Sequence, residues 1–574
     1  MIRSFQDILL RAGSLPPQRV AVLYPDDPDV MKAVKEGMRR KYIEPILIGV
    51  KPNIQAIASE IGLDLNSIKI IHIEDEQKGA DFCVDQVIEG KVSFIIKGKI
   101  LTAYMYRSLI KATRKLKPDE IPCTICFHQT KGLNKIFAIT DPGVNIKPDL
   151  KKKFRILNNA ISVLKRLEFD RVGVMVLSAR REVSPDLISA REGEILRNMF
   201  FEHNDDGIIS IDNEINIIEA FGNKPFKEDK FPNLFLVPNI ETGNILVKTI
   251  DHLILGLRQC VTVGAGIITL KKSEATMNFD QIIEIARRRG PKRMVVIEKG
   301  NGSFHGVALK ARDIGLVDPI FIGGGKYLDG ANGINFIHEP NLEKAKIKGL
   351  EMVIEKEARI FMDPTPLGRS LLMSLDDKRI GLKKRRLISY ISIFESLKDG
   401  RLTLFTDTYI NDNPNLKDKV AIAENAIEIA DILGIKRPKI AAIAPLELVN
   451  PAIASTIDAA VLSKMSDRGQ FGSAIIEGPL GMDNAESVMA ARRKGIESPV
   501  PGNVDIYLYP DIESAYLTTQ FVFVLGKVRH AGMLGGVNIP TVTLTPLDTE
   551  RSCLLNIALA VMNAHGLSAT TNEG

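Results

Sequence analysis

The 574-residue sequence contains no tryptophan, only five cysteines, and no apolar run that approaches the ~18 residues of a transmembrane helix. An odd number of widely spread cysteines does not make a disulfide framework. Cys123 and Cys126 form a CxxC, but no second pair or histidine set accompanies them, and zinc needs about four ligands. The start, MIRSFQDILLRAG, is typical of an amphipathic helix and not of a signal peptide. We therefore expect a cytoplasmic protein without a membrane segment or a metal site.

The sequence also lacks a large net charge of either sign. The sequence has 76 Lys and Arg against 70 Asp and Glu, a net charge of +6, and the basic residues are scattered. This argues against a nucleic-acid footprint but allows local basic clefts for phosphate-bearing ligands. With 45% hydrophobic and 25% charged residues, the composition is that of a soluble globular protein, and the length predicts roughly three to five domains.

What the sequence does contain is an internal repeat. TDPGVNIKPDLKKKFRILNNAI at 140–161 aligns without a gap with TDTYINDNPNLKDKVAIAENAI at 406–427, and eleven of the 22 positions are identical. The openings of the two halves match too. This predicts a tandem duplication, with copy one at 1–278 and copy two at 279–574. Copy one has no closing helix to match RSCLLNIALAVMNAHG, so either that helix is lost or MNFDQIIEIARRRG serves both copies.

In each copy, short apolar stretches rich in β-branched residues, such as RVAVLYP and LFLVPN, alternate with amphipathic stretches. Continuous apolar strands between helices indicate mostly parallel sheets that are covered on both faces. At about 280 residues, each copy is long enough for two three-layer α/β lobes. Because homologous subunits usually pair about a two-fold axis, we also expect the copies to pack as an internal pseudo-dimer.

Candidate binding residues follow the strands, because ligands of open α/β sheets bind beyond the carboxyl ends of strands. PNIETGN follows LFLV, and its Gly243-Asn244 is expected to open a helix and offer backbone N–H groups to an anion, with Lys248 one turn further. The plainer alternative is a helix N-terminus with an exposed lysine. Lys97-Gly98 follows VSFII, where copy two has Met362-Asp363.

Charged residues at matched positions of the two copies are further candidates. Arg107 follows Lys97-Gly98 on the next helix, and copy two keeps Arg369 there. Asp212 in GIISIDN and Asp483 in GPLGMDN both come after a strand. The aspartates of the shared Thr-Asp, at 141 and 407, are more simply helix caps.

These stretches resemble the phosphate acetyl/butyryltransferase family, most closely phosphate butyryltransferase, once in each copy. Copy two resembles the family through VNPAIASTIDAAVLSKMSDRGQ at 449–470 and EGPLGMDNAES at 477–487, and copy one through its first 160 residues and PNIETGNILVK. The resemblance implies the reversible reaction acyl-CoA + phosphate ⇌ acyl phosphate + CoA. It implies CoA as a substrate, small molecules as the partners, no nucleic acid, no membrane, and neither a metal nor a permanently bound cofactor.

The fold that the resemblance implies is two α/β lobes per copy with an interlobe cleft, similar to isocitrate dehydrogenase. Mapped onto this chain, the last strand and helix of a copy return to its first lobe. Copy one then divides into lobe I, about 1–141 plus 256–278, and lobe II, about 142–255. Copy two divides into lobe I, about 279–407 plus 528–574, and lobe II, about 408–527.

The sequence departs from the family at one place. Family members carry a Ser-Arg pair after the last strand, as in LTSRAD, whereas copy two has Thr545-Pro546 there and copy one has Lys271-Lys272. Thr545 keeps a hydroxyl, but Pro546 has neither charge nor N–H, and lysines lack the guanidinium fork. Arg551, one turn further on, is a partial substitute.

Three hypotheses remain open. In the first, the protein is a working phosphate acyltransferase; the candidates for binding are Lys97, Gly98, Gly243, Asn244, Lys248, Lys271, Lys272 and Arg551, and those for catalysis are Arg107, Asp212, Arg369, Asp483 and Thr545. In the second, both sites have decayed and the protein binds acyl-CoA or acyl phosphate as a sensor or assembly partner. In the third, the fold carries another reaction on a phosphorylated or CoA-linked substrate. The acyl chain, the direction, the general base and the number of working sites stay open.

Overall fold

The computed structural model describes residues 16–569 with gaps at 101, 117–120, 131–132, 168, 170, 180–188, 202–208, 213–216, 218–231, 255–256, 264–278, 299–304, 325–333, 368, 377–386 and 399. Contacts divide the chain into two compact units that largely correspond to copy one and copy two. We describe each unit by itself. The join between the copies, and with it Lys271 and Lys272, lies outside the described residues.

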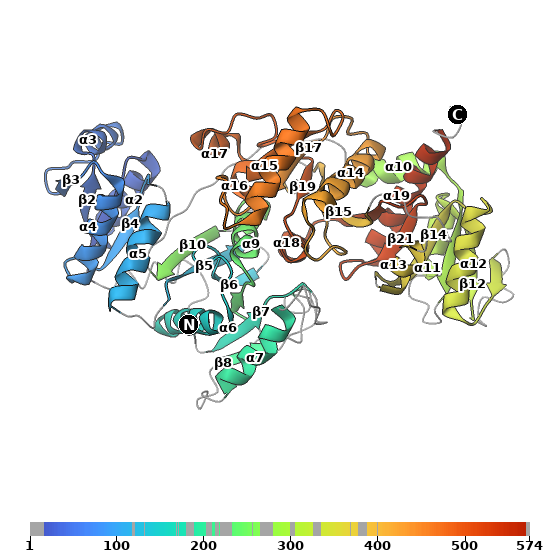
Figure 1. The fold of residues 1–574 in the computed structure, drawn as a ribbon, viewed down its shortest axis with the longest axis horizontal. Coiled ribbons are helices and arrows are strands. Elements are labelled where there is room, and N and C mark those ends of the chain that lie inside the picture. Colours follow the sequence, from blue (N-terminus) through green and yellow to red (C-terminus); the bar gives the residue numbers. More distant parts are fainter. Residues whose placement is uncertain are drawn as a thin grey trace. The chain divides into compact units, whose positions relative to one another are not determined.

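Copy one begins with a four-stranded parallel sheet in the order β3-β2-β1-β4. Its strands are β1 (Gln18–Leu23), β2 (Ile43–Gly49), β3 (Lys69–His72) and β4 (Phe94–Lys97), and its helices are α2 (Pro28–Arg39), α3 (Lys51–Glu60), α4 (Glu76–Ile88) and α5 (Thr102–Leu116). Alternate residues of β1 enter opposite cores: Val20 and Val22 pack with α2 and α3, and Ala21 and Leu23 with α4 and α5. This is the three-layer arrangement that continuous apolar strands predict (Figure 1).

The second sheet of copy one has the order β10-β5-β6-β9-β7-β8. The strands are β5 (Cys123–Thr130), β6 (Leu133–Thr140), β7 (Val172–Val176), β8 (Ile209–Asp212), β9 (Leu234–Leu236) and β10 (Leu257–Val263), with helices α6 (Leu150–Arg166), α7 (Ser189–Phe201) and α9 (Ile240–His252). β5 runs antiparallel to both of its neighbours, and the remaining pairs are parallel.

Copy two repeats the plan, with five described strands in its first sheet, β13-β12-β11-β14-β21, and a second sheet β18-β17-β19-β16-β15-β20. The strands are β11 (Lys292–Glu298), β12 (Val317–Gly323), β13 (Asn335–His338), β14 (Ile360–Pro366), β15 (Ser389–Glu395), β16 (Leu402–Thr406), β17 (Lys439–Ile443), β18 (Ile475–Leu480), β19 (Ile506–Leu508), β20 (His530–Gly535) and β21 (Thr541–Leu544).

Ten helices of copy two are described: α10 (Phe279–Arg289), α11 (His305–Asp313), α12 (Leu342–Ile354), α13 (Arg369–Asp376), α14 (Leu416–Ile432), α15 (Ala454–Asp467), α16 (Met482–Glu486), α17 (Val488–Arg493), α18 (Ile512–Gly526) and α19 (Glu550–Ala569). The opening helix α10 packs against the closing helix α19 of its own copy. The segment that would close copy one lies outside the described residues.

Ion pairs of two buried lysines preserve the repeat in three dimensions. In copy one, Lys153 on α6 pairs with Glu192 on α7, and in copy two, Lys419 on α14 pairs with Asp458 on α15. Both pairs span 39 residues, and all four side chains lie 266 residues from their counterparts. Each lysine therefore joins the same two helices, so the duplication extends through α7 and α15 even where the sequences have diverged.

The expected lobe boundaries at 141 and 407 are wrong, because strands that precede these residues belong to the second sheet of each copy and not to the first. β5, β6 and β10 belong to the six-stranded sheet of copy one, and β15, β16 and β20 to that of copy two. In copy two, β21 returns to the first sheet beside β14, as expected. The error arises because apolar strands before the shared Thr-Asp show nothing of which sheet they join; the antiparallel pairings of β5 and β15 with their neighbours decide it.

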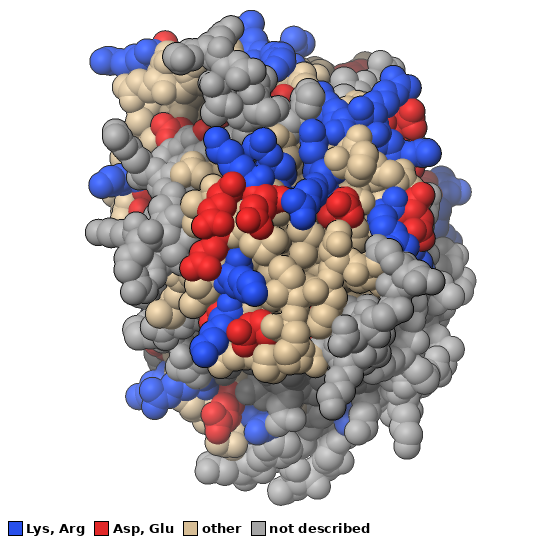
Figure 2. All heavy atoms as spheres, turned by 90° about the vertical axis from the view of Figure 1, so that its right-hand side faces the viewer, with Lys and Arg blue, Asp and Glu red and all other residues tan. Residues whose placement is uncertain are grey.

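The cysteine prediction also needs a correction. Cys126 is disulfide-bonded, while Cys83, Cys123 and Cys553 are free. The antiparallel register places Cys260 of β10 directly opposite Cys126 of β5. No helix among the described residues is long and apolar enough to span a membrane. On the face drawn in Figure 2, the described basic and acidic side chains are interspersed.

Candidate active site

Lys97 and Gly98 stand where β4 ends, as the sequence predicts. Lys97 is half-buried, and its Nζ lies 3.3 Å from the carbonyl oxygen of Gly98. A Cβ on residue 98 would come within 2.0 Å of the Tyr24 carbonyl oxygen, because Gly98 and Lys99 donate their N–H groups to the end of β1. Glycine at 98 therefore has a structural reason, and Lys97 is the chemically informative member of the pair.

Arg107 lies on α5 and is exposed. Its Nη1 donates to Gln77 Oε1 at 3.2 Å, and its guanidinium lies over the ring of Tyr104, 5.6 Å from the centroid. An exposed guanidinium with a neutral partner keeps its full charge for an anion. Asp212 ends the edge strand β8, and its side chain is outside the description.

The Gly243-Asn244 stretch lies inside the first turn of α9 and does not open that helix. Asn239 precedes the helix, and its Oδ1 accepts from the N–H of Thr242 at 2.8 Å. The N–H of Gly243 donates to the carbonyl of Asn239, so the expected offer of this N–H to a ligand is wrong. A Cβ at 243 would lie 2.7 Å from Cα of Pro142, which explains the glycine by close packing.

Asn244 and Lys248 follow on the same helix, and both are half-buried. Asn244 Nδ2 donates to the carbonyl of Pro142 at 3.4 Å. Its Oδ1 is buried and has no hydrogen-bond partner among the described residues. A buried amide oxygen without a partner is costly, so a ligand that donates a hydrogen bond there would be stabilised.

The shared Thr-Asp anchors a loop and does not cap a helix. Asp141 accepts from the N–H groups of Thr124, Val144 and Asn145 at 2.8, 3.2 and 2.9 Å. Asp407 accepts in the same way from Tyr390, Ile410 and Asn411 at 3.0, 3.3 and 2.9 Å.

Burial raises the pKa of both carboxyl groups, and the N–H groups oppose that shift. The helix caps are instead Asp149 and Asn415. The loops 141–145 and 407–411 are therefore held identically in both copies.

What lies around these loops differs between the copies. Copy one has Thr124, Gly143 and Asn244, and the matched positions of copy two are Tyr390, Tyr409 and Tyr516. In copy two, the ring of Tyr409 lies 5.2 Å from that of Tyr390 and 5.4 Å from that of Tyr516, edge to face. Gln520, which replaces Lys248, donates to the Tyr409 hydroxyl at 3.2 Å. Three packed rings thus fill the place that copy one leaves to small and polar side chains.

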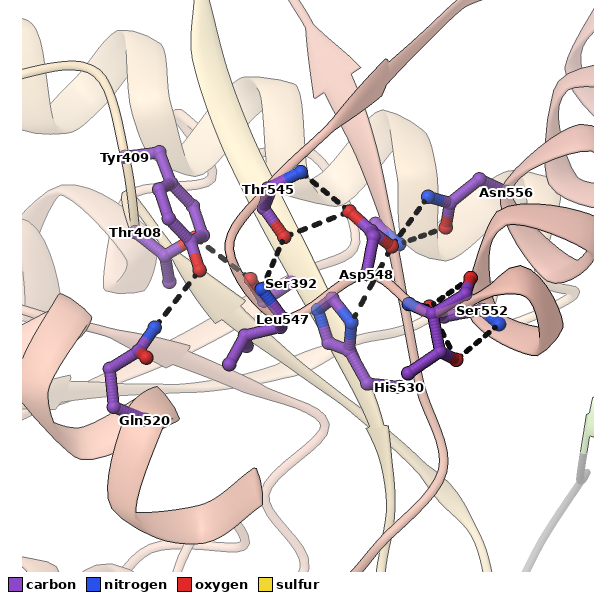
Figure 3. A network of polar contacts seen from close by, with 12 residues as sticks. Ser392, Thr408, Tyr409, Gln520, His530, Thr545, Leu547, Asp548, Ser552 and Asn556 are labelled. Carbon is purple, nitrogen blue, oxygen red and sulfur yellow. Dashed lines mark hydrogen bonds and ion pairs between the residues drawn. The ribbon is translucent and has the colours of Figure 1, made fainter. Parts of the chain in front are cut away.

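Thr545 is buried and bound to a residue that the sequence analysis missed (Figure 3). Its N–H and its hydroxyl both donate to Asp548 Oδ2, at 2.6 and 2.8 Å, and Asn556 Nδ2 donates to Asp548 Oδ1 at 3.0 Å. Burial lowers the pKa of the adjacent His530 to about 4, so this imidazole is neutral at pH 7. The Thr545 hydroxyl therefore closes the β21–α19 turn. The signal for Asp548 was its place three residues after Thr545, which is turn spacing.

A charge is reversed at the end of the first sheet of copy two. Val20 pairs with Phe94 and the matched Met294 with Ile360, so Lys97 corresponds to Asp363, one residue from the sequence alignment. Asp363 is fully buried, and its Oδ2 lies 3.2 Å from Nζ of the buried Lys346 on α12. The lysine at this end of copy two is therefore paired within the protein.

The other copy-two candidates lie on three different helices, α13, α16 and α19. Arg369 begins α13, with its side chain outside the description, and Arg551 is exposed on α19. Asp483 on α16 accepts from Lys494 at 3.2 Å, and Lys494 also reaches Glu447 at 2.9 Å. In the described part of the chain, no three His, Cys, Asp or Glu side chains are grouped so that they could hold a metal ion.

The family model described as phosphate acetyl/butaryl transferase matches residues 85–254 and 370–561, once in each copy. The chain belongs to this family. It is 32% identical over 295 residues to a phosphate butyryltransferase of Clostridium acetobutylicum, which covers 50% of this chain and 98% of that protein. It is 33% identical over 222 residues to a phosphate acetyltransferase of Thermotoga maritima, covering 39% of this chain and 76% of the relative.

Among solved structures, a branched-chain phosphotransacylase of Enterococcus faecalis V583 matches with a TM-score of 0.44 and 25% identity. That match covers 47% of this chain and 99% of the other.

Proposed function

We propose that the protein is a phosphate acyltransferase that catalyses acyl-CoA + phosphate ⇌ acyl phosphate + CoA, with its working site in copy one. Membership of the family and the names of the relatives support the reaction. The observation that carries the choice of copy is the ring-filled place in copy two. There, Tyr390, Tyr409 and Tyr516 occupy the positions of Thr124, Gly143 and Asn244.

The reaction sets physical demands that copy-one residues meet. An oxygen of phosphate forms a bond to the thioester carbonyl carbon, a tetrahedral oxyanion develops, and the carbon–sulfur bond breaks to release CoA as a thiolate. No electron donor or acceptor is needed. Phosphate carries the nucleophilic oxygen itself, so cations that hold it in place supply much of the catalysis. The general base stays open, and Asp212 is a weak candidate because only its strand position is described.

Lys97 and Lys248 are the side chains that we assign to phosphate. Both are half-buried, which strengthens their attraction for an anion relative to an exposed lysine. The amide of Asn244, one turn before Lys248, is assigned to a donor group of the substrate, because its Oδ1 lacks a partner among the described residues. Arg107, Lys271 and Lys272 remain candidates for the same anionic groups. The pairing of the copies as a pseudo-dimer and further self-association also stay predictions.

A second candidate function is supported by the absence of the Ser-Arg pair from both copies. Under this alternative, the protein binds acyl-CoA or acyl phosphate without turnover. Phosphate-dependent release of CoA separates the two functions, because a binding protein releases none.

The experiment is a thiol-release assay with phosphate and a series of acyl-CoAs. Lys248→Gln removes the cation and is expected to lower kcat/KM at least about 30-fold, since a cation that pairs with phosphate contributes about 2 kcal/mol. The matched control is Gln520→Met at the equivalent position of copy two, which is expected to leave turnover unchanged. Loss of turnover in Gln520→Met alone would move the site to copy two. No turnover by the unmodified protein, with calorimetric binding of acyl-CoA, would favour the second function.

A further inference from the structure

We infer that Tyr106 and Thr124 form a hydroxyl pair that positions the two lobes of copy one for catalysis; this inference rests on the proposed function. Tyr106 lies on α5, the helix that covers the first sheet, and Thr124 lies on β5 in the second sheet. The Tyr106 hydroxyl and Thr124 Oγ1 are 3.2 Å apart. The bond therefore joins the two lobes of copy one.

The first end of this link reaches the basic residues of the first lobe. Met105 and Leu109 of α5 pack into the core on the face of the first sheet that α4 and α5 cover, which fixes the helix to that sheet. Tyr106 is not part of this core and is half-buried. Its neighbour Arg107 and the strand-end Lys97 thus belong to the same body as the Tyr106 hydroxyl.

The second end reaches α9 through a series of short contacts. Thr124 donates its N–H to Asp141 Oδ1 at 2.8 Å, and Asp141 holds the loop 141–145 by further N–H groups. Pro142 of that loop accepts from Asn244 on α9 and lies against Gly243. A displacement of Thr124 is therefore passed to the helix that carries Asn244 and Lys248.

Gly143 leaves the space that the pair needs. A Cβ at 143 would lie 3.2 Å from the Tyr106 hydroxyl oxygen and 3.3 Å from Thr124 Oγ1, both tighter than ordinary contact. In copy two the three positions read Gly368, Tyr390 and Tyr409, so neither Tyr106 nor Thr124 is kept and Gly143 is replaced by a tyrosine. The Tyr106–Thr124 pair is thus present in copy one, which has Lys97 and Lys248, and absent from copy two, which has Asp363 and Gln520 at those positions.

The consequence for the reaction is a fixed spacing between cations of the first lobe and those of α9. Phosphate held from both sides needs that spacing to within a fraction of an ångström, and small misplacements lower kcat more than they weaken binding. Tyr106 is therefore a positioning residue. Removing its hydroxyl is expected to reduce kcat about 5- to 10-fold, with KM for acyl-CoA unchanged within about twofold.

A double-mutant cycle tests the pair. Tyr106→Phe and Thr124→Val are expected to reduce kcat equally, and the double variant to be no worse than either, because the same bond is lost each time. Thr124→Ser keeps the hydroxyl and is expected to restore most of kcat, which a purely volumetric role of Thr124 would not allow. The matched control is Thr408→Val, which removes the buried Ser392–Thr408 hydroxyl pair inside a single lobe of copy two, 2.9 Å long, and is expected to leave kcat unchanged.

Hydrogen exchange gives a readout that does not depend on turnover. In Tyr106→Phe, the amides of 121–130 and 141–145 are expected to exchange faster than in the unmodified protein, and in Thr408→Val they are not. Unchanged kcat together with unchanged exchange in Tyr106→Phe, or fully additive losses in the double variant, would overturn the inference. If the unmodified protein shows no turnover, the proposed function fails, and the exchange rates alone still decide whether the pair holds the lobes.

Discussion

The loops that follow β6 in copy one and β16 in copy two are held by the same carboxylate network, yet their surroundings are opposite in character. Around 141–145 lie Thr124, Gly143 and Asn244, and around 407–411 lie three tyrosine rings. Duplication thus preserved the scaffold of both sites and changed the side chains that a substrate would meet. The shared framework is a property of the fold, and we base the proposal that copy one binds the substrate on the residues that differ.

The two copies also differ in the charge at the end of the first sheet. Copy one places Lys97 there, and copy two places Asp363, which is neutralised by Lys346. A buried ion pair contributes little net stability, but an anionic ligand can no longer use its lysine. Under the proposed function, the rings and this ion pair occupy in copy two the positions that we assign to substrate binding in copy one.

The largest expected effect distinguishes Lys346, whose charge stabilises the fold, from Lys97, whose charge we assign to substrate binding. Lys346→Met leaves Asp363 buried without its cation and is expected to cost about 3 to 5 kcal/mol of the unfolding free energy of copy two. Lys97→Met, at the half-exposed end of β4, is expected to cost less than about 1 kcal/mol but to weaken phosphate-dependent turnover. Chemical denaturation and the thiol-release assay measure the two quantities. Equal destabilisation by both variants would contradict the division.

Exchanging a ring between the copies comes next. Gly143→Tyr places the copy-two ring beside Tyr106 and Thr124 and is expected to lower kcat/KM at least about 100-fold, equivalent to about 2.7 kcal/mol of lost transition-state stabilisation. The reciprocal Tyr409→Gly is expected to destabilise copy two without creating activity, because Asp363 and Gln520 remain. Retained turnover in Gly143→Tyr would mean that the substrate does not enter this place.

The smallest effect concerns pH. Since burial lowers the pKa of His530 from about 6.5 to about 4, the unfolded chain binds a proton there before the folded one does. Stability is therefore complete above about pH 6.5 and falls as the pH drops toward 4, by about 2 kcal/mol between pH 7 and 5. His530→Phe is expected to flatten this dependence, as seen by thermal unfolding at a series of pH values. An unchanged slope in that variant would assign the loss to other groups.

The repeat, the family and the layered α/β fold were predictable from the sequence, because long identical strings and apolar strands carry them locally. Contacts that join distant segments were not. The antiparallel pairing of β5 with β10, far along the chain, is one such contact, and the disulfide of Cys126 was not predicted either. The partner of Asp363 stands on a preceding helix, and its pairing needs the helix to lie over the strand end.

The site residues stay predictions, but the structure shows that some of them have structural roles that the sequence analysis did not assign. Lys97 ends β4, whereas Asn244 and Lys248 lie within α9 and not at its start. Gly98 and Gly243 instead serve close backbone packing, and the Thr545 hydroxyl is bound by Asp548. The sequence shows that a glycine or a hydroxyl group is present. Whether that group is available to a ligand or is taken up by contacts within the protein depends on the residues that surround it in the fold.

The central claim, that copy one holds the single working site, is tested most directly by the stoichiometry of ligand binding. Isothermal calorimetry with CoA and phosphate on the full chain is expected to give one site per chain, and Gly143→Tyr is expected to abolish it while Tyr409→Gly leaves it intact. Two equivalent sites per chain, or a single site that survives Gly143→Tyr and disappears in Tyr409→Gly, would contradict the account.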